Sequence, residues 1–172
     1  MLEPGEYYAT STRELLYTLL GSCISACIFD LENGVAGMNH FMLPGVLNPR
    51  NMLLNDIGRY GMFAMELLIG EIIKQGGDRR HLNAKIFGGA SVMKTGGNAN
   101  IPQANIHFAR KYLELEGIPL LAECVGGTRG RKVLFFPETG KVLLKYIESA
   151  QAMAPLEKAE ELYVDKVRHT IR

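Results

Sequence analysis

Short apolar runs bounded by turn residues recur along the chain and predict a fold rich in strands. Two of them cover residues 23–30 and 35–39, and the Asn33-Gly34 pair between them is a strong hairpin signal. The other predicted strands cover residues 6–10, 84–87, 118–124, 132–136 and 141–146. Directly after the predicted strand at residues 6–10, Ser11 or Thr12 is expected to cap a brief helical turn at residues 13–16.

Three longer stretches repeat their apolar residues every three to four positions, which is typical of amphipathic helices. The first should end at Gly76-Gly77, and its apolar face consists of Leu53, Ile57, Ala64, Leu68 and Ile72. The second covers residues 102–116 and has a proline near its start. The third, at about 155–171, has a charged outer face and an inner face of Leu156, Ala159, Tyr163, Val167 and Ile171. Packing against the domain is its favoured role, and docking of a partner is the alternative.

Together these elements predict an α/β protein, more exactly a mixed α+β fold. Two loops lie between these elements. The first covers residues 44–51, and the second is the glycine-rich passage from Gly88-Gly89 to Gly96-Gly97. A loop of about a dozen residues in a compact domain is usually functional or disordered. A phosphate-binding function is disfavoured, because Lys94-Thr95 lacks a glycine at the required spacing.

Composition narrows the class of protein. The 172 residues suit a single domain over 1–172, and 19 glycines suit a turn-rich fold. The net charge of +1, without runs of like charge, indicates no nucleic-acid partner. No apolar run approaches the ~20 residues of a membrane span and no signal peptide is evident, so we expect a cytoplasmic protein that is not membrane-embedded. Three cysteines without framework spacing fit reduced thiols.

A cysteine and a histidine at the ends of the two central runs are the minimum set for thiol catalysis. A two-residue turn at Asn33-Gly34 would place Cys27 opposite His40, with Cys23 roughly 13 Å away along a regular strand. Either Cys27 is the partner of His40, or the two runs are not neighbours in one sheet. Gly21-Ser22 favours the second alternative, because a glycine lets backbone N–H groups approach a reacting centre. Spacing alone leaves both open.

A metal site is the main chemical competitor. Cys23, Cys27, Cys124 and His40 offer four soft ligands, the number that a structural zinc needs. The spacing Cys-x3-Cys is unusual for zinc, however, and no second close pair exists. We therefore predict neither a metal nor another cofactor.

Several motifs resemble the CheD family of chemoreceptor glutamine deamidases. They span most of the chain, from about Pro4 to Tyr146, and comprise Pro4-Gly5-Glu6-Tyr7-Tyr8, Leu20-Gly21-Ser22-Cys23, Gly37-Met38-Asn39-His40, Val125-Gly126-Gly127 and Gly130-Arg131-Lys132. The chain departs from the family pattern at Pro102 and Ala104, where only Asn105 remains of an Ile-Gly-x-Arg-Asn run, and at Cys124, where an aspartate is common.

The resemblance implies a cysteine hydrolase, a protein-glutamine glutaminase that converts receptor glutamines to glutamate in chemotaxis. The nucleophile would be Cys23, held as a thiolate by His40 as base. Thr18 would be the third catalytic residue, with Tyr17 as the alternative register. Substrate-binding residues would be Gly21, Ser22, Asn39, Gly88, Gly89, Gly126 and Gly127.

The implied fold is a β-sandwich-like core flanked by helices, similar to deamidase toxins of the cytotoxic necrotizing factor type. The implied partners are methyl-accepting chemotaxis receptors, as substrate, and a CheC-type phosphatase. The alternative function is an adaptor that binds and stimulates such a phosphatase, with or without catalysis of its own.

Overall fold

The computed structural model describes residues 1–45, 55–92 and 100–170. In chain order, the elements within these ranges are β1 (Tyr7–Thr10), β2 (Leu16–Leu20), β3 (Ile24–Asp30), β4 (Val35–Asn39), α1 (Asp56–Lys74), the 3-10 turn η1 (Arg79–His81), β5 (Asn83–Gly88), α2 (Ile101–Leu115), β6 (Leu120–Val125), β7 (Arg131–Phe136), β8 (Lys141–Tyr146) and α3 (Ala150–Thr170). The mixed α+β class is therefore confirmed.

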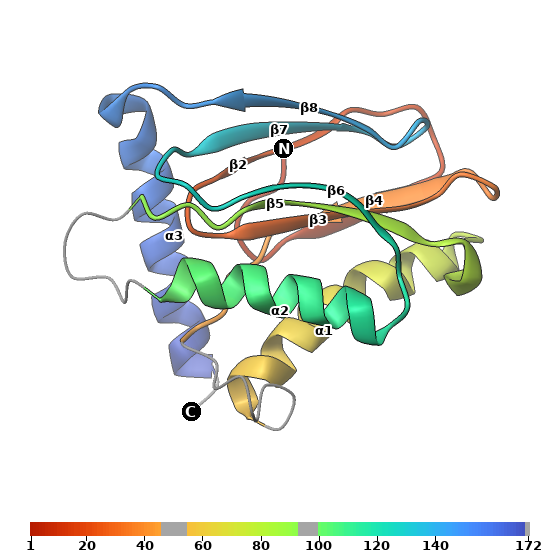
Figure 1. Ribbon diagram of the computed structural model, residues 1–172, viewed down its shortest axis with the longest axis horizontal. Coiled ribbons are helices and arrows are strands. Elements are labelled where there is room, and N and C mark those ends of the chain that lie inside the picture. Colours follow the sequence, from red (N-terminus) through yellow and green to blue (C-terminus); the bar gives the residue numbers. More distant parts are fainter. Residues whose placement is uncertain (46–54, 93–99, 171–172) are drawn as a thin grey trace.

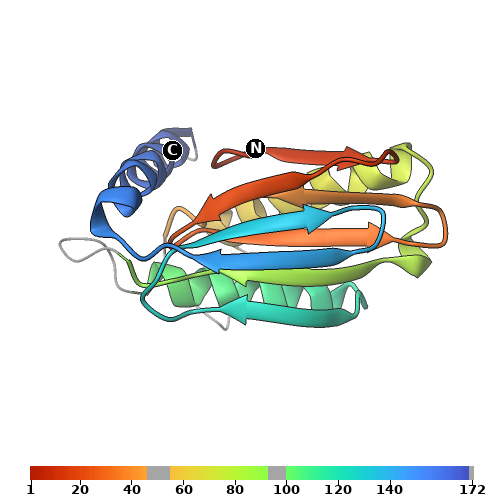
Figure 2. The same cartoon turned by 90° about the horizontal axis from the view of Figure 1, so that it is seen from above.

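The strands form two sheets that pack face to face. The larger sheet has the order β1-β4-β3-β5-β6, with β5 and β6 parallel and the other pairs antiparallel. The smaller sheet has the order β2-β7-β8 and is antiparallel. Helices α1 and α2 cover the outer face of the larger sheet, and α3 crosses one end of the two sheets (Figures 1 and 2).

The side chains of β3 point alternately to the two faces of the larger sheet and enter two separate apolar layers. Ile24, Ala26 and Ile28 face α1 and α2, in a core that also contains Met65, Leu68 and Phe108. The intervening residues face the smaller sheet, where Phe29 lies 6.3 Å from Phe135 between ring centroids. Because successive side chains point to opposite faces of a strand, Cys23 and Cys27 both enter the layer between the sheets.

The hairpin between β3 and β4 is confirmed, so the favoured alternative, in which the two runs are not neighbours in one sheet, is wrong. The register also differs from that of a two-residue turn. The turn has four residues, 31–34, and the ladder pairs Asp30 with Val35 and Cys27 with Met38. The Asp30 carboxylate stabilises this turn by accepting hydrogen bonds from the backbone N–H (3.0 Å) and the side-chain amide (2.7 Å) of Asn33. His40 therefore does not lie opposite Cys27. The position of the first run that lies opposite His40 is midway between Cys23 and Cys27.

Two other predictions need correction. The helical turn at residues 13–16 is absent: residues 11–13 form bends, and Leu16–Leu20 is a strand paired with β7. The C-terminal helix is confirmed but begins at Ala150, and its buried stripe differs from the predicted face: it consists of Met153, Leu156, Glu160, Val164 and Val167. Leu53, Gly96-Gly97 and Ile171 lie outside the described residues.

A bilayer span requires a helix of about 20 predominantly apolar residues. Among the described residues, no helix is long and apolar enough to cross a membrane.

Candidate active site

Cys23 and His40 meet in the layer between the two sheets, at the end covered by α3. Cys23 is the last residue before β3, and His40 directly follows β4. Both are buried, with 0% and 1% of their surface exposed. Potential ligand atoms of Cys23, His40 and Glu160 all lie within 4.8 Å of one another. The structure thus brings Cys23, rather than Cys27, together with His40 and adds a carboxylate from α3.

Thr18 fixes the orientation of the His40 ring. Its hydroxyl lies 2.7 Å from His40 Nδ1 and 2.8 Å from the main-chain oxygen of Leu2. A carbonyl can only accept, so the hydroxyl proton goes to Leu2 and the Nδ1–H of His40 donates to Thr18. His40 Nε2 is then unprotonated, and it has no hydrogen-bond partner among the described residues. This is the tautomer that can accept a proton from a thiol.

Thr18, and not Tyr17, occupies this place because the two point to opposite faces of β2. Thr18 is fully buried, whereas Tyr17 is half-buried and its ring lies 4.8 Å from the ammonium of Lys132.

The loop of residues 21–23, which we call the nucleophile loop, is held by all three of its carbonyl groups. Gly21 O accepts from the backbone N–H of Ala90 (2.8 Å), and Cys23 O from that of Gly89 (2.7 Å). Ser22 O accepts from the side-chain amide of Asn105 (2.8 Å), whose oxygen also accepts from the backbone N–H of Leu43. The carbonyls therefore face α2 and the end of β5, and the N–H groups of the loop remain available on the other side.

The N–H groups of the nucleophile loop converge on one carboxylate, that of Glu160. Oε1 accepts from the N–H of Gly21 (2.9 Å) and of Cys23 (3.2 Å). Oε2 accepts from the N–H (2.9 Å) and the hydroxyl (2.5 Å) of Ser22. Gly21 permits this approach, because a Cβ at that position would lie 2.9 Å from Glu160 Oε2. The loop is a preformed site for an oxygen that carries negative charge.

Burial sets the protonation states of the pair. The pKa of the Cys23 thiol is raised well above its ordinary value, mainly because burial disfavours the thiolate and further because of the Glu160 charge. Burial also lowers the pKa of His40 to about 4. With α3 in place, the pair is therefore a neutral thiol beside a neutral imidazole, which differs from the thiolate that the sequence led us to expect.

The zinc set considered from the sequence does not assemble. Of its four members only Cys23 and His40 come together among the described residues, while the sulfur of Cys124 contacts the Tyr146 hydroxyl at 3.3 Å. The third member of the observed cluster, Glu160, already accepts four hydrogen bonds. A carboxylate surrounded by donors indicates an anion site rather than a metal site.

The other predicted substrate residues lie around or behind the nucleophile loop. Gly88 pairs with Ile24, and Gly126 N–H donates to Gly88 O (2.9 Å). Gly127 O accepts from Ser91 N–H (2.8 Å). Gly89 faces α2, since a Cβ there would lie 2.5 Å from Ile106. Gly89 thus contacts the loop directly through its hydrogen bond to Cys23 O, whereas the hydrogen bonds of Gly126 and Gly127 go to Gly88 and Ser91.

Asn39 points away from the site. Its side chain accepts from the backbone N–H of Ala26 (2.9 Å) and contacts α1 through Ala64 O (3.3 Å). It lies on the face of β4 opposite to His40, and its role in binding substrate stays a prediction.

Glu160 is the residue that the sequence interpretation missed. The inner face predicted for the C-terminal helix does not include it. A signal was present: Glu160 is four residues from both Leu156 and Val164, so it continues their apolar stripe.

Comparisons with known proteins agree with the motifs. A family model described as CheD chemotactic sensory transduction matches residues 42–146. A probable chemoreceptor glutamine deamidase CheD of Hahella chejuensis is 46% identical over 168 residues, which cover 97% of this chain and 78% of the relative. Proteins of the same name from Laribacter hongkongensis and Thiobacillus denitrificans are 46% and 42% identical, over 96% and 98% of this chain and 80% and 83% of theirs. The chain therefore belongs to the CheD family.

Proposed function

We propose that this protein deamidates glutamine side chains of methyl-accepting chemotaxis receptors, with Cys23 as the nucleophile. Three relatives are named as probable chemoreceptor glutamine deamidases. The observation that carries the chemistry is the hydrogen bond from His40 to Thr18, which leaves Nε2 unprotonated in the cluster that contains Cys23.

The reaction begins with proton transfer from Cys23 Sγ to His40 Nε2. The thiolate attacks the carboxamide carbon of the substrate, and the N–H groups of Gly21 and Cys23 stabilise the oxyanion. His40 then gives its proton to the amide nitrogen, the C–N bond breaks, and ammonia leaves. Water, activated by His40, cleaves the resulting thioester and leaves a glutamate side chain with a regenerated thiol.

A purified chemoreceptor fragment tests the substrate. We expect the protein to convert specific receptor glutamines to glutamate with equimolar release of ammonia, measured by peptide mass spectrometry and an ammonia assay.

Free glutamine should be a very poor substrate, because its charged amino and carboxylate groups would need fixed counter-charges. Comparable specificity constants for free glutamine and receptor would instead indicate a small-molecule amidase.

Thr18→Val tests the tautomer. Valine has nearly the shape of threonine but accepts no hydrogen bond, so His40 loses the group that fixes Nε2 as the base. We expect kcat on receptor to fall by roughly tenfold to a hundredfold, part of the 10²–10⁴-fold that general acid–base catalysis supplies. KM should change little, because Thr18 is buried behind the histidine.

Thr18→Ser is the matched control for this variant. Serine keeps the hydroxyl and should retain most of the activity. Equal losses in the valine and serine variants would show that Thr18 acts only through packing.

The CheC-type phosphatase and a cytoplasmic location stay predictions. Co-purification of the two proteins would test the first, and intact catalysis would not contradict such a second role.

A further inference from the structure

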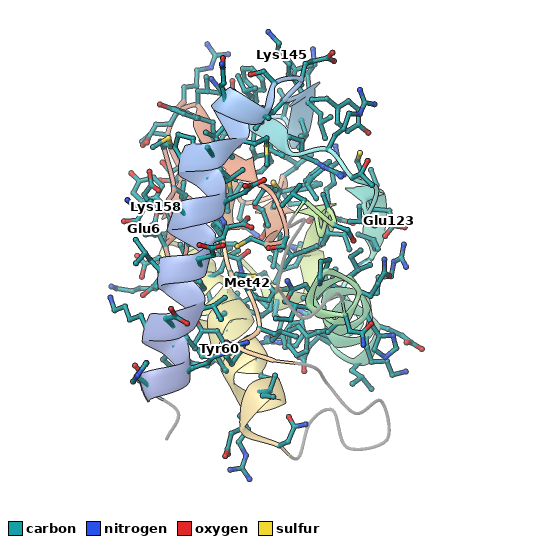
Figure 3. All side chains as sticks on the ribbon, turned by 90° about the vertical axis from the view of Figure 1, so that its left-hand side faces the viewer. Glu6, Met42, Tyr60, Glu123, Lys145 and Lys158 are labelled. Atoms are coloured by element: carbon teal, nitrogen blue, oxygen red, sulfur yellow. The ribbon has the colours of Figure 1, made fainter. Side chains whose placement is uncertain are left out.

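Helix α3 closes the candidate active site. Cys23 has no exposed surface, so a receptor side chain can reach it only if a covering element moves. Figure 3 shows α3 running across this end of the molecule, beside Met42 and Tyr60. The Tyr163 hydroxyl of α3 contacts that of Tyr60, and Val164 packs in the same core layer as Cys23.

Among the covering elements, α3 can leave without dismantling the nucleophile loop. It belongs to neither sheet and is held at its two ends by side-chain contacts: Met153 against Gly130, and the Arg168 guanidinium to Pro44 O (3.0 Å). The carbonyls of the loop are anchored to Gly89, Ala90 and Asn105 instead. Departure of α3 would therefore free the N–H groups of the loop and keep their geometry.

Glu160 enters the site as a substrate side chain would. The other inward residues of α3 are apolar, namely Met153, Leu156, Val164 and Val167. At the centre of this stripe, one glutamate carboxylate takes all the donors of the nucleophile loop. A glutamate side chain is also what a deamidated glutamine becomes. Helix α3 thus presents to Cys23 the chemical group that the proposed reaction produces.

We propose that α3 occupies the groove in which the receptor helix docks, with Glu160 in the place of the substrate side chain. The inference rests on the proposed function. It specifies the substrate of the enzyme as an amphipathic helix that carries a glutamine in the middle of an apolar stripe. The Oε1 position, between the N–H groups of Gly21 and Cys23, is the place of the carboxamide oxygen. The amide nitrogen would lie on the Oε2 side, where it gives up the hydrogen bond from the Ser22 N–H and the Ser22 hydroxyl can accept from it instead of donating.

Glu160→Gln turns this arrangement into an internal substrate. Cys23 Sγ would bond to the carboxamide carbon of the introduced glutamine, ammonia would leave with a proton from His40, and water would release a glutamate. We expect peptide mass spectrometry of the purified full-length variant to find residue 160 as glutamate. In the double variant with Cys23→Ala it should remain glutamine. Glu161→Gln, an exposed neighbour on the same helix, is the matched control and should keep its amide.

The outcomes separate the two proposals. If residue 160 keeps its amide while the wild-type protein deamidates receptor, the docking proposal is wrong and the proposed function stands. If residue 160 is converted by Cys23 but neither wild-type protein nor Glu160→Ala acts on receptor, the thiol chemistry holds, and the receptor as substrate and as occupant of the groove is wrong.

Glu160→Ala tests the covering role by a second measurement. Loss of four hydrogen bonds to a charged group should favour release of α3, and loss of the Glu160 charge removes one cause of the raised pKa of the Cys23 thiol. Iodoacetamide should therefore alkylate Cys23 roughly tenfold faster or more, and only release of α3 should also raise receptor turnover. Receptor turnover should rise in parallel, whereas Glu161→Ala should leave both rates unchanged. Slower alkylation in Glu160→Ala would mean that the carboxylate supports the loop rather than occupying a docking groove, and would overturn the proposal.

Discussion

Replacement of Cys23 by alanine is expected to reduce receptor deamidation to the uncatalysed background. The variant removes the atom that bonds to the substrate in the proposed reaction, and losses of about 10⁴-fold or more are usual when a hydrolase loses its nucleophile. Conversion of receptor glutamine to glutamate, measured by mass spectrometry at equal protein concentration, gives the result directly. The nucleophile loop should be undisturbed, because residue 23 takes part in its hydrogen bonds through main-chain atoms.

Cys27→Ala is the matched control. Cys27 lies on the same face of β3, is equally buried, and pairs with Met38 in the ladder. Burial raises the pKa of its thiol as well, so the sulfur should be inert. Most of the activity should survive this substitution. The reverse pattern, with loss in Cys27→Ala and retention in Cys23→Ala, would contradict the assignment of the nucleophile.

His40→Gln should lower kcat on receptor by about 10³-fold, within the range of general acid–base catalysis. Glutamine can still contact Thr18 but cannot relay a proton between the thiol and the leaving amide. His107→Gln, an exposed histidine on α2, is the control and should be silent. Activity within tenfold of wild type in His40→Gln would show that another group ionises Cys23.

The same variant tests the effect of burial on His40. Its pKa is about 4 in the folded protein against an ordinary value of 6.5, so unfolding takes up a proton between these pH values. The neutral ring therefore contributes stability above pH 6.5, and about 3 kcal/mol of it is lost as the pH falls toward 4. Denaturant unfolding at several pH values should show this loss in wild type and a smaller one in His40→Gln.

Local sequence patterns predicted most of the elements because those elements carry their own periodicity. The β7–β8 hairpin and α2 match the apolar runs and the glycines that bound them. Strand β2 was missed because Leu16–Leu20 becomes a strand by pairing with β7, more than a hundred residues later. Such a long-range partner overrides local preference.

The candidate site was predictable only in part, for related reasons. The motif around Cys23 singled out the cysteine that lies beside His40, and an apolar stripe predicted the last helix. The partner of Cys23 depended on a register that the side chain of Asp30 changes by closing a four-residue turn. The position of Glu160 depended on which face of α3 is buried, and a charged residue is usually exposed unless other groups satisfy it. Those groups lie about 140 residues earlier in the chain.

The contact between Thr18 and Leu2 has an evolutionary consequence. The proton of His40 is directed by a main-chain oxygen, so in the proposed mechanism residue 2 takes part without contributing a side-chain functional group. Its side chain needs only to fill apolar space, and exchange for another apolar residue of similar size would leave the chemistry unchanged. We therefore expect a survey of related sequences to record position 2 as freely variable among apolar residues, and its part in the proposed mechanism would escape any method that reads side-chain identity.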